Sequence, residues 1–269
     1  MLEPVVVRAV LLSLLPGLFW LVYLRSLSRR RGIPPWLWLW ALGLGWASTE
    51  LTLFLSHQLN VDVLMRFPVV PLLVYFLLGV GLVEEGCKAI CAFFGVSVSG
   101  LARDPLVTLQ LSGAVALGFA TTENIMYVQS YGEGVLVGRF LFSTLGHVLF
   151  SSVWGFAMGV REGTEGNMHR RWGLLFGCLL LSSLTHGLYD WFLSTNRMGL
   201  AVLTLAVLWF GFRQATLEAF LRQEYERETP YQNRQCVACT VLTRAEGEFC
   251  SFCGARMEQA PSLEGQPNL

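Results

Sequence analysis

The sequence predicts an all-α polytopic membrane protein with about seven transmembrane helices, followed by a small C-terminal zinc ribbon. Hydrophobic residues make up 54% of the 269 residues and charged residues only 14%, against about 25% charged in soluble proteins. The mean hydropathy is +0.51. The third observation is a set of four cysteines near the C-terminus. With a formal net charge of zero and no basic groove, we expect no nucleic-acid partner.

Seven apolar segments are long enough, or nearly so, to cross about 30 Å of hydrocarbon. In chain order they are Val5–Leu24, Trp36–Leu55, Leu72–Phe94, Leu106–Val128, Arg139–Val160, Trp172–Leu193 and Met198–Phe212. The first is predicted to be a retained span, because no small-residue cleavage site separates it from the basic residues that follow. Pro34 and Pro35 open the second span, and Pro68 and Pro71 open the third. The last span is the shortest.

The arginines predict an orientation with the N-terminus outside and the C-terminus inside, because cytosolic connections are enriched in Lys and Arg. The predicted cytosolic ends carry Arg25, Arg29, Arg30, Arg31, Arg103, Arg161, Arg170 and Arg171. The opposite ends carry Arg8, Arg66, Arg139 and Arg197. We therefore expect a multi-pass protein of the cell membrane with a cytosolic C-terminal segment.

The third span contains three ionisable residues, Glu84, Glu85 and Lys88, in an otherwise apolar stretch. Charges at this depth cost at least about 2.5–3.5 kcal/mol each, so a pair or a wet cavity must offset the cost. Glu84 and Lys88 stand at i and i+4 and can neutralise each other on one helix face. Glu85 is then expected to point elsewhere, without a local partner. The alternative is a buried ion pair that only fixes helix packing.

Three later spans also carry polar groups. The fourth contains Phe119, Glu123 and Asn124, the fifth His147, and the sixth His186 and Asp190 at i and i+4. Counted along each span at about 1.5 Å per residue, these groups fall at compatible depths in the non-cytosolic half. We expect them to converge on one cavity with the glutamates. Glu50 in the second span is a secondary candidate.

These motifs are E-E-x-x-K, F-x-x-x-E-N, a lone histidine and H-x-x-x-D, and together they resemble the PrsW family of intramembrane proteases. The segments 118–127 (GFATTENIMY) and 185–190 (THGLYD) look like that family nearly residue for residue. The family is similar in turn to the CAAX prenyl protease and bacteriocin-immunity superfamily. The resemblance covers Leu72 to Phe212 and implies cleavage of membrane protein substrates in the bilayer, with signalling proteins such as anti-sigma factors among them.

The chemistry can also be derived from the residues, because peptide hydrolysis needs a base that activates water and a group that stabilises the oxyanion. Our preferred hypothesis makes Glu85 the general base and pairs Glu84 with Lys88, although the two glutamates can exchange roles. His147 and His186 would polarise the substrate carbonyl and assist proton transfer, or bind a metal ion.

The remaining motif residues are interpreted as supporting groups. Glu123 and Asp190 would orient a histidine or join a ligand set, and Asn124 would bond substrate or a neighbouring helix. A catalytic zinc site remains open. We favour a metal-free glutamate mechanism, because the strongest motif lacks the H-E-x-x-H pattern of metalloproteases.

Two other functions fit part of the pattern. Chains of carboxylates and histidines also mark proton or ion paths, which suggests a proton-coupled transporter or relay. The sequence lacks the internal symmetry and paired broken helices that transporters commonly show. The other alternative is a non-catalytic membrane scaffold that recruits a cytosolic protein through the zinc ribbon.

The domain organisation follows from these segments: a membrane domain over 1–213, an amphipathic linker helix over 214–230, a zinc ribbon over 231–257 and a disordered tail over 258–269. Two C-x-x-C pairs form the ribbon, namely Cys236, Cys239, Cys250 and Cys253. Four thiolates saturate zinc, so the predicted zinc is structural.

Overall fold

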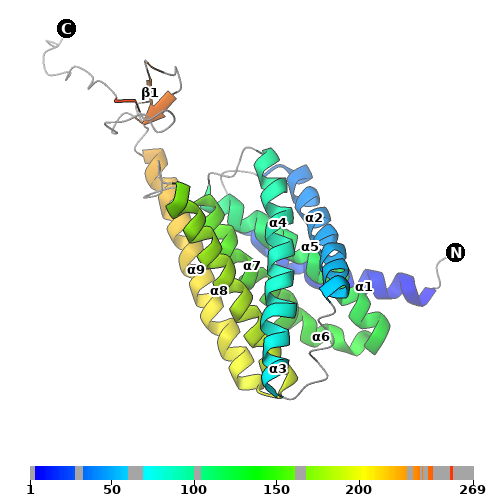
Figure 1. Ribbon diagram of the computed structural model, residues 1–269. Coiled ribbons are helices and arrows are strands. Elements are labelled where there is room, and N and C mark those ends of the chain that lie inside the picture. The colour runs from blue at the N-terminus through cyan, green and yellow to red at the C-terminus, as the bar shows by residue number, and fades with distance from the viewer. Residues whose placement is uncertain are drawn as a thin grey trace, which may run out of the picture.

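The computed structural model describes residues 4–27, 33–59, 69–99, 104–160, 168–228, 233–236, 238, 242–244 and 255–256. Nearly all of the described residues are helical. The helices are α1 (Pro4–Ser26), α2 (Pro35–Leu59), α3 (Val69–Val74), η2 (Tyr75–Leu82), α4 (Val83–Ser99), α5 (Pro105–Tyr131), η3 (Glu133–Val135), α6 (Leu136–Gly138), η4 (Arg139–Ser143), α7 (Thr144–Gly159), α8 (Met168–Ser194) and α9 (Met198–Glu228). η2 and η4 are π-helical, and η3 is a 3₁₀ turn. Figure 1 shows the long helices gathered into one bundle.

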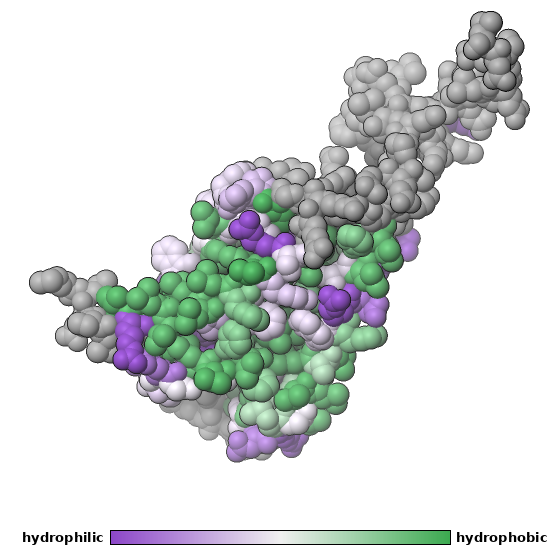
Figure 2. Space-filling view, turned by 180° about the vertical axis from the view of Figure 1, so that it is seen from behind, coloured by the Kyte–Doolittle hydropathy of each residue, from purple (hydrophilic) through white to green (hydrophobic). Residues whose placement is uncertain are grey.

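The prediction of an all-α polytopic membrane protein is confirmed, and each of the seven predicted spans coincides with a helix or a continuous helical run. Within the described residues, four helices are long and apolar enough to cross a membrane, at 105–131, 133–159, 169–194 and 198–221, and 10–26 is a shorter apolar helix. The helical run from α3 to α4 is continuous, and its apolar sequence contains three charged residues, Glu84, Glu85 and Lys88. The face drawn in Figure 2 is largely hydrophobic, as expected of a surface that contacts lipid.

α5 is the central helix of the bundle and packs against α1, α2 and α7. It begins where the sequence provides a start signal: the Asp104 carboxylate accepts hydrogen bonds from the Leu106 and Val107 amides at 2.9 and 3.3 Å, and Pro105 occupies the first turn. It ends at Gly132, whose φ of +81° favours glycine. The packing against α1, α2 and α7 fixes the position of α5, the helix that carries Glu123.

Two glycines allow η2 and α8 to approach each other at backbone distance. A Cβ added at Gly81 would collide with the Ser183 carbonyl oxygen, and one added at Gly187 would collide with the Phe76 carbonyl oxygen. Small residues permit such close helix packing in membranes. The contact brings the start of α4, with its glutamates, against the middle of α8.

Two predicted boundaries were wrong. The connection between the predicted fourth and fifth spans, residues 129–138, is mostly helical: α5 extends to Tyr131, and a helical run resumes at Glu133 directly after Gly132. Residues 214–228 are helical as expected, but they continue α9 without a break. No proline or glycine interrupts the helix after Gly211, so nothing in the sequence ends it at the predicted boundary.

The C-terminal segment contains an antiparallel strand pair. β1 (Asn233–Gln235) pairs with β2 (Leu242–Arg244), with Arg234 opposite Thr243. Cys236 follows β1 directly and is buried. The other three predicted zinc ligands, at 239, 250 and 253, and the predicted disordered tail lie outside the described residues, so the zinc ribbon stays a prediction.

Candidate active site

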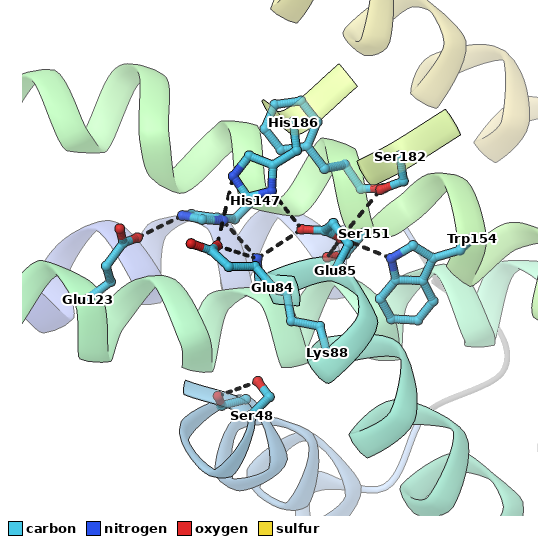
Figure 3. Close-up of polar contacts among 12 residues, drawn as sticks. Ser48, Glu84, Glu85, Lys88, Glu123, His147, Ser151, Trp154, Ser182 and His186 are labelled. Atoms are coloured by element: carbon cyan, nitrogen blue, oxygen red, sulfur yellow. Dashed lines mark hydrogen bonds and ion pairs between the residues drawn. The ribbon is translucent and has the colours of Figure 1, made fainter. Parts of the chain in front are cut away.

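Residues of all four polar motifs lie close together, as Figure 3 shows for Glu84, Glu85, Lys88, Glu123, His147 and His186. α4 contributes Glu84, Glu85 and Lys88; α5 contributes Phe119, Glu123 and Asn124; α7 contributes His147; and α8 contributes His186 and Asp190. The side chains are joined by hydrogen bonds and ion pairs across all four helices. The structure therefore brings these side chains together at one site, as the sequence predicted.

Lys88 is wholly buried at the centre of this network. Its Nζ lies 2.8 Å from Glu85 Oε1, 3.3 Å from Glu84 Oε2 and 3.0 Å from His147 Nδ1. The fourth side of the ammonium faces the ring of Phe119, whose centroid is 3.9 Å away. Three acceptors and an aromatic face compensate the cost of burying this charge.

Glu85 is the most enclosed carboxylate, which corrects the expectation that it has no local partner. Its Oε1 accepts from Lys88 at 2.8 Å and faces His186 Nδ1 at 3.1 Å. Its Oε2 accepts from Ser151 at 2.8 Å, Trp154 Nε1 at 2.9 Å and Ser182 at 3.4 Å. A carboxylate has about four lone-pair sites, so this side chain, with none of its surface exposed, is fully satisfied.

Glu84 is held more loosely than its neighbour. Its Oε2 lies 3.3 Å from Lys88 and 3.8 Å from His186 Nε2, and 14% of its side chain is exposed. Lys88 therefore pairs with both glutamates, and its shorter contact is with Glu85 at i−3. The reason is that α7 and α8 provide the other donors to Glu85 and hold it beside the ammonium. The structure thus inverts the predicted contrast between the two glutamates.

His147 lies between a carboxylate and an ammonium. Its Nε2 is 2.8 Å from Glu123 Oε2, and its Nδ1 is 3.0 Å from Lys88. Because an ammonium only donates, Nδ1 accepts and Nε2 carries the proton that is donated to Glu123. Asn124, predicted to bond substrate or a neighbouring helix, donates to Thr144 Oγ1 on α7 at 3.2 Å.

His186 is oriented from the opposite side of the site. Its Nδ1 meets Glu85, and its Nε2 lies 3.4 Å from Asp190 Oδ2. The ring also stacks on Phe150 with centroids 4.5 Å apart. Because the Nδ1 proton is directed to the Glu85 carboxylate, Nε2 points toward Glu84 and Asp190, the partly exposed part of the site.

The residues fit a divalent metal ion by both geometry and charge. Glu84, His147 and His186 each present a ligand atom within 4.8 Å of the others, and one carboxylate with two imidazoles is a donor set of catalytic zinc sites. His147 would bind an ion through Nδ1, in place of its contact with Lys88. Counted by charge, the network joins four carboxylates to two cationic side chains. They are Glu84, Glu85, Glu123 and Asp190 against Lys88 and Arg139. A divalent cation or protonated histidines would balance the excess.

Both π-helical segments directly precede residues of the site. η2 ends at Leu82, two residues before Glu84, and η4 begins at Arg139 and leads into the helix of His147. A π turn shifts the register of the following helix, and such turns occur often at functional sites. We infer that these shifts in register help to direct the glutamates and the histidine toward the site.

Four residues of the network were missed by the sequence reasoning: Ser151, Trp154, Ser182 and Arg139. Three of them carry a usable signal, because Ser151 and Trp154 stand at i+4 and i+7 from His147, and Ser182 at i−4 from His186. Arg139 was interpreted only as a marker of topology. The secondary candidate Glu50 has an exposed side chain on α2 and is not among these contacts.

Long apolar helices around a buried site of glutamates, histidines and a lysine define a polytopic membrane protein with a polar centre between its helices. The family model described as PrsW family intramembrane metalloprotease matches residues 33–213. The chain therefore belongs to the PrsW family, and the match begins before the predicted limit at Leu72 and includes α2.

Several curated relatives named Protease PrsW are similar to this chain. The protein of Geobacillus kaustophilus (strain HTA426) is 32% identical over 140 residues, 51% of this chain and 61% of the relative. Those of Clostridioides difficile (strain 630) and Shouchella clausii (strain KSM-K16) are 30% and 33% identical, over 48% and 43% of this chain and 57% and 52% of the relatives. The chain thus spans less than two thirds of these relatives. No solved structure matches it.

Proposed function

We propose that this protein is an intramembrane endopeptidase that cleaves membrane-embedded or membrane-proximal proteins at the site around Glu84. The observation that carries the proposal is the contrast between the two neighbouring glutamates. Glu85 is saturated by donors, whereas Glu84 is partly exposed beside His147 and His186. A base must reach the water that it activates, so Glu84 is now the preferred base, and Glu85 is the group that holds Lys88 and His186.

The residues perform the hydrolysis as follows. The Glu84 carboxylate takes a proton from a water molecule, whose oxygen attacks the scissile carbonyl carbon. Glu84 passes this proton to His186 Nε2, which lies 3.8 Å from Glu84 Oε2 while Glu85 holds Nδ1. His186 then donates the proton to the leaving amine as the carbon–nitrogen bond breaks. His147 is fixed in one tautomer by Glu123 and Lys88 and completes the polar wall that faces the carbonyl.

The family description and the donor set support a divalent metal ion held by Glu84, His147 and His186. When bound, the ion would polarise the carbonyl and make the water more acidic. With Glu84 among the ligands, either Asp190 or Glu123, both partly exposed, would serve as the base for the water. This arrangement replaces our initial preference for a metal-free mechanism as the hypothesis to test first.

The C-terminal cysteines are proposed to hold a structural zinc ion on the cytosolic side. The support is the spacing of the two C-x-x-C pairs and the position of buried Cys236 directly after β1, which pairs with β2. Signalling proteins as substrates, and a cytosolic protein recruited by this segment, are further proposals that follow from the family resemblance and the topology.

The experiment is proteolysis in liposomes with a panel of single-span membrane proteins. We expect the wild type to cut at least one of them, and Glu84→Gln to cut none. A chelator is added to a full-length chain in which Cys236, Cys239, Cys250 and Cys253 are replaced by serine. Loss of cleavage there, restored by added zinc, identifies metal chemistry at the membrane site. Glu84-dependent proton flux without cleavage would instead support the transporter alternative.

A further inference from the structure

Arg139 is a buried cation that the proposed chemistry does not use. It is the first residue of η4, and only 9% of its side chain is exposed. One terminal nitrogen (NH2) donates to Glu123 Oε2 at 2.7 Å, and Nε donates to Asn124 Oδ1. The guanidinium carbon also lies 3.8 Å from the ring centroid of Tyr127. The Arg139 side chain thus contacts three residues of α5, namely Glu123, Asn124 and Tyr127.

An arginine that served only to mark the membrane boundary would not need this environment. Interfacial arginines extend toward water, whereas the guanidinium of Arg139 is turned inward onto a carboxylate, an amide and an aromatic face. Fixed donors of a guanidinium orient a carboxylate more strictly than an ammonium can. The contacts therefore fix the position of Glu123.

Glu123 passes this constraint on to the site. The same oxygen, Oε2, accepts from Arg139 at 2.7 Å and from His147 Nε2 at 2.8 Å. His147 in turn contacts Lys88 and stands within the donor set with Glu84 and His186. Arg139 does not itself reach that set, and its shortest chain of side-chain contacts to His147 runs through Glu123.

We propose that Arg139 is a positioning residue: by anchoring the Glu123 carboxylate it holds the His147 ring in its reactive orientation. This inference rests on the proposed function. Partners that orient a metal-binding or catalytic histidine typically contribute 10–100-fold to affinity or activity. The π turn of η4 explains how Arg139, eight residues before His147, can act on the same site, because it changes the helical register between them.

The kinetic test uses Arg139→Gln in liposomes with a substrate that the wild type cuts. We expect kcat to fall about 10–100-fold with KM nearly unchanged, because substrate contacts remain while the geometry of the histidine is lost. The double variant Arg139→Gln/Glu123→Gln should have the same kcat as Glu123→Gln alone. Arg139→Lys, which retains a charge beside Glu123, should recover part of kcat. An unchanged kcat in Arg139→Gln, or independent effects in the double variant, overturns the inference.

Arg8→Gln is the matched control. Arg8 also forms a 2.7 Å ion pair with a glutamate, Glu133, but 69% and 40% of the two side chains are exposed, and neither contacts the residues of the site. Its removal should leave kcat unchanged. A fall in kcat equal to that of Arg139→Gln would mean that any lost arginine pair impairs the protein, and would overturn the assignment to Glu123 and His147.

A second measurement does not depend on proteolysis. The unfolding midpoint in SDS is compared for Arg139→Gln, His147→Gln and their combination, in the wild-type background and in a Glu123→Gln background. Residues without a shared partner show additive effects. We expect the two losses to be non-additive in the wild type and additive without Glu123. Additive losses in both backgrounds overturn the inference even where no substrate is cut, so its failure is distinct from failure of the proposed function.

Discussion

The polar network has an inner half and an outer half that differ in exposure. The inner half, formed by Glu85, Lys88, Ser151, Trp154 and Ser182, is buried or satisfied at every contact described. The outer half consists of Glu84, Glu123 and Asp190, with 14%, 18% and 26% of their side chains exposed.

The difference in exposure indicates which glutamate has a structural role and which one is available for catalysis. A carboxylate that accepts several short hydrogen bonds is stabilised where it is and has no capacity left for a water molecule or a metal ion. Glu85 is such a group, and its role is to hold Lys88 and His186 in place. We therefore assign the proposed chemistry to the outer half. His147 and His186 connect the two halves, since each contacts at least one group of each half.

The largest expected effect comes from the outer half. Glu84→Gln should lower the rate of cleavage by at least about 10³-fold, because a general base contributes about 10²–10⁴-fold and the carboxylate is also a candidate metal ligand. The unfolding midpoint should change little, since its contacts of 3.3 and 3.8 Å are long. Single-turnover cleavage and SDS unfolding measure the two quantities. Normal turnover by this variant would eliminate Glu84 as base and return the role to Glu85.

The next effect belongs to the inner half and concerns stability. Glu85→Gln leaves Lys88 buried without its shorter ion pair, and breaking a buried pair costs about 3–5 kcal/mol. Activity should fall as a consequence. The double variant Glu85→Gln/Lys88→Met, which removes both charges, should recover much of the free energy of unfolding. If Glu85→Gln unfolded like the wild type but had lost all activity, the inner half would be catalytic after all.

Part of this organisation was predictable from the sequence. The spans were, because hydrocarbon requires long apolar helices, and so was the convergence of Glu84, Glu123, His147 and His186, because polar groups at one depth must find partners. The choice between the two glutamates was not. Helical spacing allows Lys88 to reach either one, and the donors that decide the matter, Ser151, Trp154 and Ser182, come from helices remote in sequence.

The role of Arg139 was hidden for another reason. Its position at the predicted end of a span fits the usual preference of arginine for the interface, and a regular helix gives no reason to link it with His147. The π turn of η4 and the early start of the helical run after Gly132 place it inside the bundle. Local irregularities of this kind depend on tertiary packing and leave little trace in the hydropathy pattern.

A smaller effect would sharpen the description of the inner half. Trp154→Phe keeps most of the apolar surface but removes the indole donor to Glu85 Oε2, at 2.9 Å. An unsatisfied buried carboxylate contact costs about 1–3 kcal/mol, which should appear in the SDS unfolding midpoint with little change in KM. Trp172→Phe, on the partly exposed start of α8, serves as a control for loss of an indole alone. Equal decreases of the unfolding midpoint in the two variants would contradict a specific stabilising role of the hydrogen bond from Trp154 to Glu85.

The smallest effect tests the outer half at its most exposed member. Asp190→Asn retains the shape of the side chain but weakens its 3.4 Å contact with His186 Nε2. Because the contact is long and 26% of the Asp190 side chain is exposed, the unfolding midpoint should stay near that of the wild type. The rate should nevertheless fall about tenfold, since His186 loses a carboxylate that orients it. A change confined to stability would place Asp190 with the inner half and contradict the assignment of the chemistry to the outer half.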